Sequence, residues 1–196
     1  MMHIILASRS PRRIELLKQI QIDCTVIPAD IDESVKSGEL ALDYVQRLAI
    51  EKAEAVLHQQ TGPSEVLILA ADTTVALNGE ILGKPEDDVD AINMLKKLSG
   101  TTHQVHTAIA VCGYNRTVSA INTTQVTMRV LSDAMIQHYI ESGEHRDKAG
   151  SYGIQGLAGA WIERIDGSYS GVMGLPLYET AKLLDEMKEH NWHKKS

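Results

Sequence analysis

Four segments of this 196-residue chain carry polar side chains of the kinds that bind phosphate or its counter-ions. The first is Ser8-Arg9-Ser10-Pro11-Arg12-Arg13. Pro11 suits the first position of a helix and Ser10 suits its N-cap, so we expect a helix to begin here. The N–H groups of a helix start bind anions, and arginines in the first turn, which the helix dipole disfavours, supply charge for a phosphate. The alternative is that both arginines point into water.

Carboxylates suited to a metal ion lie in the second segment. Asp72 follows the apolar run Val66–Ala71, and we expect it at the carboxyl end of a buried strand, where open α/β sheets bind ligands. A turn or helix cap is the alternative for this residue. Asp30, Asp32 and Glu33 form an acidic run that is typical of an exposed loop. Together with Asp72, they offer the oxygen ligands that Mg²⁺ takes beside a bound phosphate.

Two lysines make up the third group. Lys52 lies at the edge of the apolar face of an expected helix, and Lys84 follows a hairpin signalled by Asn78-Gly79. The register set by that turn places Thr73 opposite Lys84. Asp72 points to the other face of an ideal ladder, so Lys84 approaches it only through twist, a bulge or its own length. Two solvated surface lysines are the alternative.

The fourth segment runs from Asp147 to Gly156 and contains three glycines. Glycine spacing of this kind lets backbone amides come close to a ligand. Gln155 carries an amide that both donates and accepts hydrogen bonds, which suits the edge of a base. An ordinary connecting loop explains the same pattern.

Apolar periodicity predicts the helices that must position these segments. We expect one to begin at Pro11, and others at 40–60, 86–98, 132–142 and 177–190. Thr61-Gly62-Pro63 ends the second of these. In the helix at 86–98 the residues expected to face inward are Val89, Ile92, Leu95 and Leu98.

Strands are expected at 4–7, at 66–71, and at 73–77 paired with 80–84. Two long alternating stretches, 101–112 and 117–130, indicate a half-buried antiparallel pair joined by a turn at Tyr114-Asn115-Arg116. Strand followed by loop and helix is the opening unit of an α/β protein. No repeat or linker divides the chain, so we expect a single domain over residues 1–196.

The composition excludes several classes of protein. The chain has 26 acidic and 19 Lys+Arg residues, a formal charge of −7, which argues against a protein that coats nucleic acid. The apolar run before Ser8 is too short for a signal peptide or a membrane span, so we expect a cytoplasmic protein without membrane partners. Cys24 and Cys112 show neither disulfide nor zinc spacing.

Taken together, the segments resemble the Maf family of nucleoside triphosphate pyrophosphatases. The resemblance covers nearly the whole chain, and its motifs occur in the family's order. They are Leu6-Ala7-Ser8-Arg9-Ser10-Pro11-Arg12-Arg13, Ile31-Asp32-Glu33, Arg47-Leu48-Ala49 through Lys52-Ala53, Ala71-Asp72-Thr73, Gly83-Lys84-Pro85, Lys148 through Gly156, and Gly174-Leu175-Pro176-Leu177.

The resemblance implies an elongated mixed α/β fold with two lobes around a central cleft, and a homodimer. It implies hydrolysis of a nucleoside triphosphate to the monophosphate and pyrophosphate with a divalent metal cation, Mg²⁺ or alternatively Mn²⁺. Asp72 would be the general base, with Lys84 and Lys52 as further catalytic residues. Metal contacts would come from Glu33 and Asp72.

By the same resemblance, the substrate-binding residues would be Ser8, Arg12, Arg13, Thr73 and Gln155. Three of them, Arg12, Thr73 and Gln155, stand where branches of the family differ, and this combination is similar to the branch that acts on dTTP and UTP. A housekeeping role in the nucleotide pool would follow, with modified pyrimidine nucleotides as further substrates. The alternative is a non-enzymatic nucleotide sensor that regulates cell division or septum formation.

Overall fold

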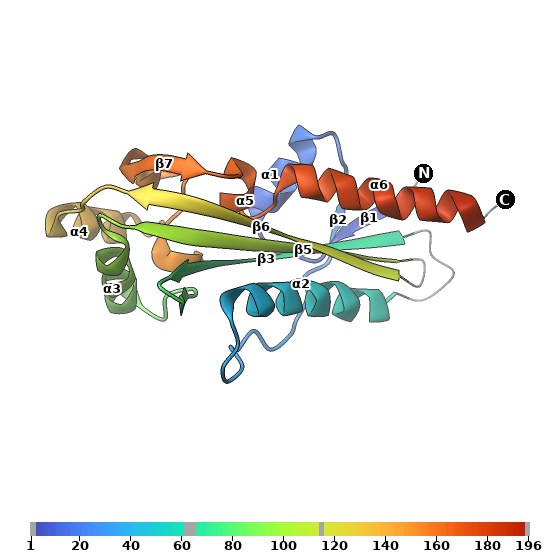
Figure 1. Cartoon of the computed structure of the whole chain (residues 1–196), viewed down its shortest axis with the longest axis horizontal. Helices are drawn as coiled ribbons and strands as arrows, with labels where there is room; N and C mark the ends of the chain where they lie inside the picture. Colours follow the sequence, from blue (N-terminus) through green and yellow to red (C-terminus); the bar gives the residue numbers. More distant parts are fainter. Residues whose placement is uncertain (1–2, 61–65, 114–115, 195–196) are drawn as a thin grey trace.

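A mixed sheet of seven strands runs through the computed structural model, which describes residues 3–60, 66–113 and 116–194. Figure 1 shows that three long strands, β3, β5 and β6, extend along most of the molecule. The strand order is β2-β1-β3-β5-β6-β7, with β4 paired to β3. The strands are β1 (His3–Leu6), β2 (Thr25–Val26), β3 (Val66–Leu77), β4 (Glu80–Leu82), β5 (Thr102–Gly113), β6 (Arg116–Met128) and β7 (Ile162–Asp166).

Helices cover the sheet differently at its two ends. At one end α1 (Pro11–Gln19) and α6 (Leu177–Lys194) pack on one face and α2 (Ala41–His58) on the other (Figure 1). At the other end a separate apolar core includes α3 (Asp88–Leu98) and α4 (Asp133–Ser142). The short elements η1 (Ala149–Ser151), η2 (Leu157–Trp161) and α5 (Tyr169–Val172) lie between α4 and α6 in the chain. The expected elongated mixed α/β fold with two lobes is confirmed.

Burial on both faces explains the continuous apolar run of β3. Leu67, Leu69 and Ala71 pack against α1 and α6, whereas Ile68 and Ala70 pack against α2. Helix ends follow local chemistry as well. Ser132 and Asp87 cap α4 and α3 with their side chains, and Gly143 ends α4 in a left-handed conformation at φ 73°.

A gap in the edge of the sheet lies beside β3. The parallel pairing of β1 with β3 ends at Leu6 and Leu69, and the antiparallel pairing of β4 begins at Val75 and Leu82. Among the described residues, no strand pairs with 70–74 on this edge. Asp72 lies in the middle of this stretch, so its predicted place at the end of a strand is wrong. The strand continues because β5 pairs with it from Ile68 to Ala76.

Most other elements agree with their predictions. The hairpin has the expected register, with Leu77 opposite Glu80, and β5 pairs with β6 along their length. Val89 was expected inside α3 but is 65% exposed, since Ala91 and Met94 take the inward positions with Leu95 and Leu98. β6 ends at Met128, so Val130 lies outside the strand. The turn at 114–115 and the helix end at 61–63 lie outside the described residues.

None of the helices in the described ranges combines the length and apolar character needed to cross a membrane.

Candidate active site

A cleft of about 550 Å³ opens at the gap in the sheet edge. Neighbouring residues of a strand point to opposite faces, and none of the described strands pairs with residues 70–74 on this edge, so side chains from both faces reach the same space. The cleft is lined by all nine catalytic, substrate-binding and metal-binding residues that the family resemblance implies. These are Ser8, Arg12, Arg13, Glu33, Lys52, Asp72, Thr73, Lys84 and Gln155.

The charge of the cleft is opposite to that of the whole chain. Its basic residues are Arg9, Arg12, Arg13, Lys52, Lys84 and Lys148, and its acidic residues are Asp30, Glu33, Asp72 and Asp147. Six minus four leaves a positive excess of two in a protein whose formal charge is −7. A cationic cleft of this size in an acidic protein suits a small polyphosphate rather than a nucleic acid polymer.

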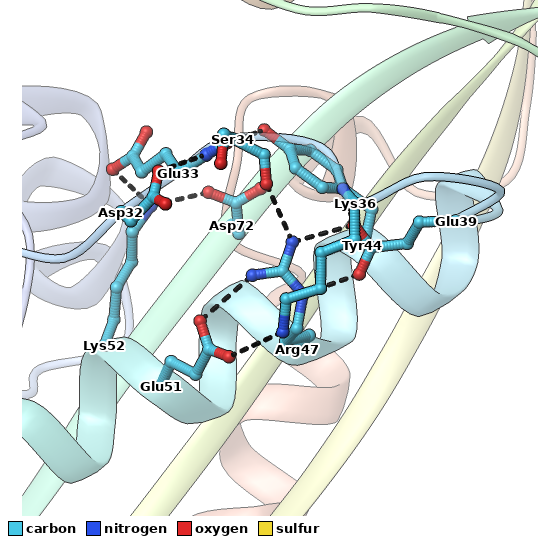
Figure 2. A network of polar contacts seen from close by, with 10 residues as sticks. All are labelled: Asp32, Glu33, Ser34, Lys36, Glu39, Tyr44, Arg47, Glu51, Lys52 and Asp72. Atoms are coloured by element: carbon cyan, nitrogen blue, oxygen red, sulfur yellow. Dashed lines mark hydrogen bonds and ion pairs between the residues drawn. The ribbon is translucent and has the colours of Figure 1, made fainter.

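Lys52 stands at the centre of the charged side of the cleft. Its Nζ lies 2.6 Å from Oδ1 of Asp72 and 2.9 Å from Oε1 of Glu33, and Figure 2 shows it reaching both carboxylates from α2. Glu33 also contacts Lys84, with 3.4 Å between Oε2 and Nζ. Lys52 is only 8% exposed, because the apolar face of α2 carries its stem into the sheet. The lysine expected at the edge of that face is therefore buried, and Glu33 links it to Lys84.

The two carboxylates have opposite pKa shifts. Burial raises the pKa of Asp72 above that of an exposed aspartate, although the charges of Lys52 and Arg13 oppose the shift. Burial also acts to raise the pKa of Glu33, but the hydrogen bond and charge of Lys52, with Lys84, outweigh it and lower that pKa. Glu33 therefore stays ionised, while Asp72 has the raised pKa that suits a proton acceptor.

Arg13 organises the other side of the cleft. Its Nη1 donates to Oγ of Ser8 at 2.9 Å, its Nε to the carbonyl of Gly174 at 2.8 Å, and its Nη2 to Oγ1 of Thr73 at 3.3 Å. Pro11 begins α1 after Ser10 as expected, but the Ser10 side chain makes no capping hydrogen bond. Its position in the first turn of α1 thus lets Arg13 contact Thr73 and Gly174, which are far from it in the sequence.

A chain of hydroxyl groups fixes the direction of each hydrogen bond at Thr73. Oγ1 of Thr107 donates its single proton to the carbonyl of Gly171 at 2.7 Å, because a carbonyl can only accept. The 2.9 Å bond between Thr73 and Thr107 must then have Thr73 as donor. With its proton committed and one lone pair accepting from Nη2 of Arg13, Thr73 has one acceptor position left for the cleft. It can therefore recognise a hydrogen-bond donor on a ligand.

The glycine-rich loop brings Gln155 and Lys148 to the far part of the cleft. A Cβ at Gly153 would lie 2.7 Å from Cε of Lys148, so a larger residue there would displace the Lys148 side chain. Tyr139 of α4 holds this loop, since its Oη accepts a hydrogen bond from the Gly153 N–H at 3.2 Å. Nζ of Lys148 donates to the carbonyl of Glu144. Gln155 itself is exposed.

Glu33 and Asp72 are suited to holding a divalent cation together with a ligand. Both carboxylates lie within 2.9 Å of one atom, Nζ of Lys52, so they converge on the same space. Among the described residues, no group of three or more His, Cys, Asp or Glu side chains could hold a metal alone. Two carboxylates completed by phosphate oxygens and water are a usual set of ligands for Mg²⁺.

Sequence reasoning missed three residues that support the site. Thr107 directs the proton of Thr73, and Tyr44 and Arg47 contact the loop that carries Glu33. Arg47 belongs to one of the motifs shared with the family, but the residues around it indicate no partner for its side chain. Asp32, which belonged to the acidic run, is exposed and accepts a hydrogen bond from the Ser34 N–H at 2.9 Å instead of facing the cleft.

The chain is similar to a well-populated group of known proteins. A family model described as Maf-like protein matches residues 3–187. A dTTP/UTP pyrophosphatase of Methylobacillus flagellatus is 58% identical over 94% of this chain and 92% of its own length. Those of Bordetella parapertussis and Alcanivorax borkumensis are 54% and 51% identical, over 92% and 94% of this chain and 90% and 95% of their own lengths. The solved structure of the Staphylococcus aureus Ham1 protein overlaps with a TM-score of 0.47 and 24% identity, covering 64% of this chain and 71% of that one.

Proposed function

Because this chain belongs to the Maf-like protein family, we propose that it is a nucleoside triphosphate pyrophosphatase that hydrolyses dTTP and UTP to the monophosphate and pyrophosphate. The observation that supports this most is the cleft itself. It combines an excess of cations with two converging carboxylates, one of which has a raised pKa. Relatives that share more than half of their residues with this chain carry the same activity in their names.

In the proposed mechanism, Asp72 accepts a proton from the water that attacks the α-phosphorus. Its Oδ1 is held by Lys52 at 2.6 Å, so we assign the proton to Oδ2. Lys52 keeps the carboxylate ionised and fixed in direction. Arg12, Arg13 and Lys84 bind the phosphate chain and offset the charge that develops on its oxygens during the reaction.

Glu33 and Asp72 would hold the divalent cation, with Mg²⁺ expected and Mn²⁺ as the alternative. When bound, the cation would supply charge stabilisation for the pyrophosphate leaving group. The lowered pKa of Glu33 keeps this ligand ionised. Ser8 orients Arg13, and Thr73 and Gln155 contact the nucleoside.

The proposed preference for dTTP and UTP agrees with the acceptor that Thr73 presents. Uracil and thymine carry a donor at N3–H, whereas cytosine has an acceptor at the same atom. A site that accepts a hydrogen bond there favours the first two bases. The amide of Gln155 both donates and accepts hydrogen bonds, so it suits a base edge on which the N3–H donor lies beside carbonyl acceptors.

A nucleotide panel tests this proposal. Pyrophosphate release is followed with dTTP, UTP, CTP, dATP and GTP in the presence of Mg²⁺. We expect dTTP and UTP to be hydrolysed well above GTP. Equal turnover of all five would remove the substrate assignment, and tight binding without turnover would instead favour a nucleotide sensor.

We also propose, from the family resemblance, that the chain forms one domain over 1–196 and acts as a homodimer in the cytoplasm. Sedimentation equilibrium at micromolar concentration checks the assembly: a mass near twice 21.5 kDa is expected, and a mass of one chain would contradict it.

A further inference from the structure

Glu33 is carried by a segment with no helix or strand, between Val26 at the end of β2 and Ala41 at the start of α2. Its side chain is 40% exposed, unlike the buried side chain of Asp72 on β3. A carboxylate on such a loop loses conformational entropy when it must point in one direction. Some part of the fold must therefore hold this loop in place.

Two side chains of α2 hold the backbone at Glu33 and at the next residue, Ser34. Oη of Tyr44 donates to the carbonyl of Glu33 at 2.9 Å, and Nη2 of Arg47 donates to the carbonyl of Ser34 at 3.0 Å. Figure 2 shows both donors rising from the helix toward the loop. Burial and the charges of Asp72 and Glu33 raise the pKa of Tyr44 to about 12, so its hydroxyl remains a donor.

Arg47 is itself fixed by a fork of ion pairs. Its Nε lies 2.5 Å from Oε1 of Glu39 and its Nη2 lies 2.7 Å from Oε2, while Nη1 lies 3.0 Å from Oε2 of Glu51 one turn along α2. Glu39 in turn accepts a hydrogen bond from the Lys36 N–H at 2.9 Å. The hydrogen bond from Arg47 lowers the pKa of Glu39 to about 2. One guanidinium thus connects the loop at Ser34 and at Glu39.

The same helix also contacts the Glu33 carboxylate through Lys52. Tyr44, Arg47 and Lys52 therefore define the position of Glu33 relative to one rigid element. Sites whose supporting contacts come from a rigid helix hold their geometry better than sites on free loops.

We propose that Arg47, together with Tyr44, is a positioning residue that holds the loop of residues 33–39 so that Glu33 meets the divalent cation beside Asp72. This rests on the proposed function for the identity of the bound complex. Arg47 does not line the cleft, so it acts through Glu33 rather than on the nucleotide.

A double-mutant cycle tests whether Arg47 acts through Glu33. Arg47→Met, Glu33→Gln and the double variant are compared by kcat/KM for UTP across a Mg²⁺ titration. We expect Arg47→Met alone to lower kcat/KM by about tenfold at limiting Mg²⁺ and to raise the Mg²⁺ concentration for half-maximal rate. In the Glu33→Gln background the same change should cost less than about twofold, because the group it positions is gone. An equal loss in both backgrounds would overturn the proposal.

A second measurement needs neither metal nor turnover. Hydrogen exchange of the peptide spanning residues 30–40 is followed by mass spectrometry in the metal-free protein. Faster exchange is expected in Arg47→Met and, to a smaller degree, in Tyr44→Phe, which removes one hydroxyl and leaves the helix intact. Unchanged exchange in both variants would overturn the proposal.

Arg116→Met is the matched control. It removes an Arg–Glu pair, with Glu186, from partly exposed residues that do not line the cleft. Mg²⁺ dependence and exchange at 30–40 should both stay unchanged, and the proposal fails if this variant alters them as Arg47→Met does. Wild-type protein that hydrolyses neither dTTP nor UTP would defeat the proposed function alone, since the exchange measurement still reports on the loop.

Discussion

The two sides of β3 differ sharply where Asp72 and Thr73 stand next to each other. On the side of α2, Asp72 belongs to a network of charges that compensate one another through Lys52 and Glu33. On the side of α1, Thr73 belongs to a chain of hydroxyls that ends at the carbonyl of Gly171, and it accepts a hydrogen bond from Arg13. A charged group can stabilise a reacting phosphate from several positions around it. In the hydroxyl chain, by contrast, each oxygen has a fixed donor or acceptor role toward its neighbour. We therefore assign proton transfer to the side of Asp72 and recognition of the base to the side of Thr73.

The largest expected effect on activity comes from Asp72, on the charged side of β3. Asp72→Asn keeps the shape of the side chain but cannot accept a proton, so kcat should fall by about 1,000-fold, while nucleotide affinity changes little. Pyrophosphate release and equilibrium binding of UTP measure the two quantities. Turnover at the wild-type rate would show that Asp72 is not the base.

Lys52→Met removes the cation shared by two carboxylates. Because Lys52 and Asp72 are buried, the free energy of unfolding should fall by about 3 kcal/mol. Urea unfolding measures the change. Lys84→Met is the matched control: Lys84 is 58% exposed and contacts Glu33 at 3.4 Å, so its loss should cost less than about 1 kcal/mol. Equal costs for the two lysines would contradict this assignment.

The pH dependence of kcat/KM, which follows ionisations of the free enzyme, tests the charged side of β3. The base must be deprotonated, and the pKa of Asp72 is raised, so activity should fall with decreasing pH at a midpoint above the ordinary aspartate value of about 3.9. Lys52→Met should move this midpoint further up, since Lys52 opposes the shift. A wild-type midpoint at or below about 3.9 would contradict the environment described for Asp72.

Thr107→Val tests the hydroxyl side. Without Thr107 the proton of Thr73 is no longer committed, so Thr73 can donate as well as accept. The ratio of kcat/KM for UTP over CTP should fall by about fivefold, corresponding to roughly one hydrogen bond. A fall in both substrates with an unchanged ratio would mean that Thr107 supports the fold without directing recognition.

The smallest effect is expected at Thr74, which provides the matched control for that variant. It is buried next to Thr73 on β3, and its Oγ1 has no hydrogen-bond partner within the described residues. Thr74→Val should leave the UTP over CTP ratio unchanged and raise Tm by about 2 °C, since an unsatisfied hydroxyl is removed. If Thr74→Val changed the UTP over CTP ratio as much as Thr107→Val does, base recognition could not be assigned to the Thr73 face of β3.

Local patterns were sufficient for most helices and strands. Pro11 and Ser132 mark helix starts that the structure shares, and Asn78-Gly79 sets the register of its hairpin. Each of these signals acts within a few residues, through φ angles and nearby N–H groups. Asp72 was misplaced because the same apolar run can end a strand or continue it, and only pairing with β5 decides.

The sequence by itself determined which residue types the site would contain, because their motifs resemble those of a known family and lie on elements with clear periodicity. The tertiary structure alone decided how they meet. Lys52 reaches a carboxylate 20 residues away, Arg13 a carbonyl 161 residues away, and Thr107 a carbonyl 64 residues away. These contacts depend on where the edge of the sheet is left open. That opening is a property of strand pairing across the chain, which no local pattern of residues encodes.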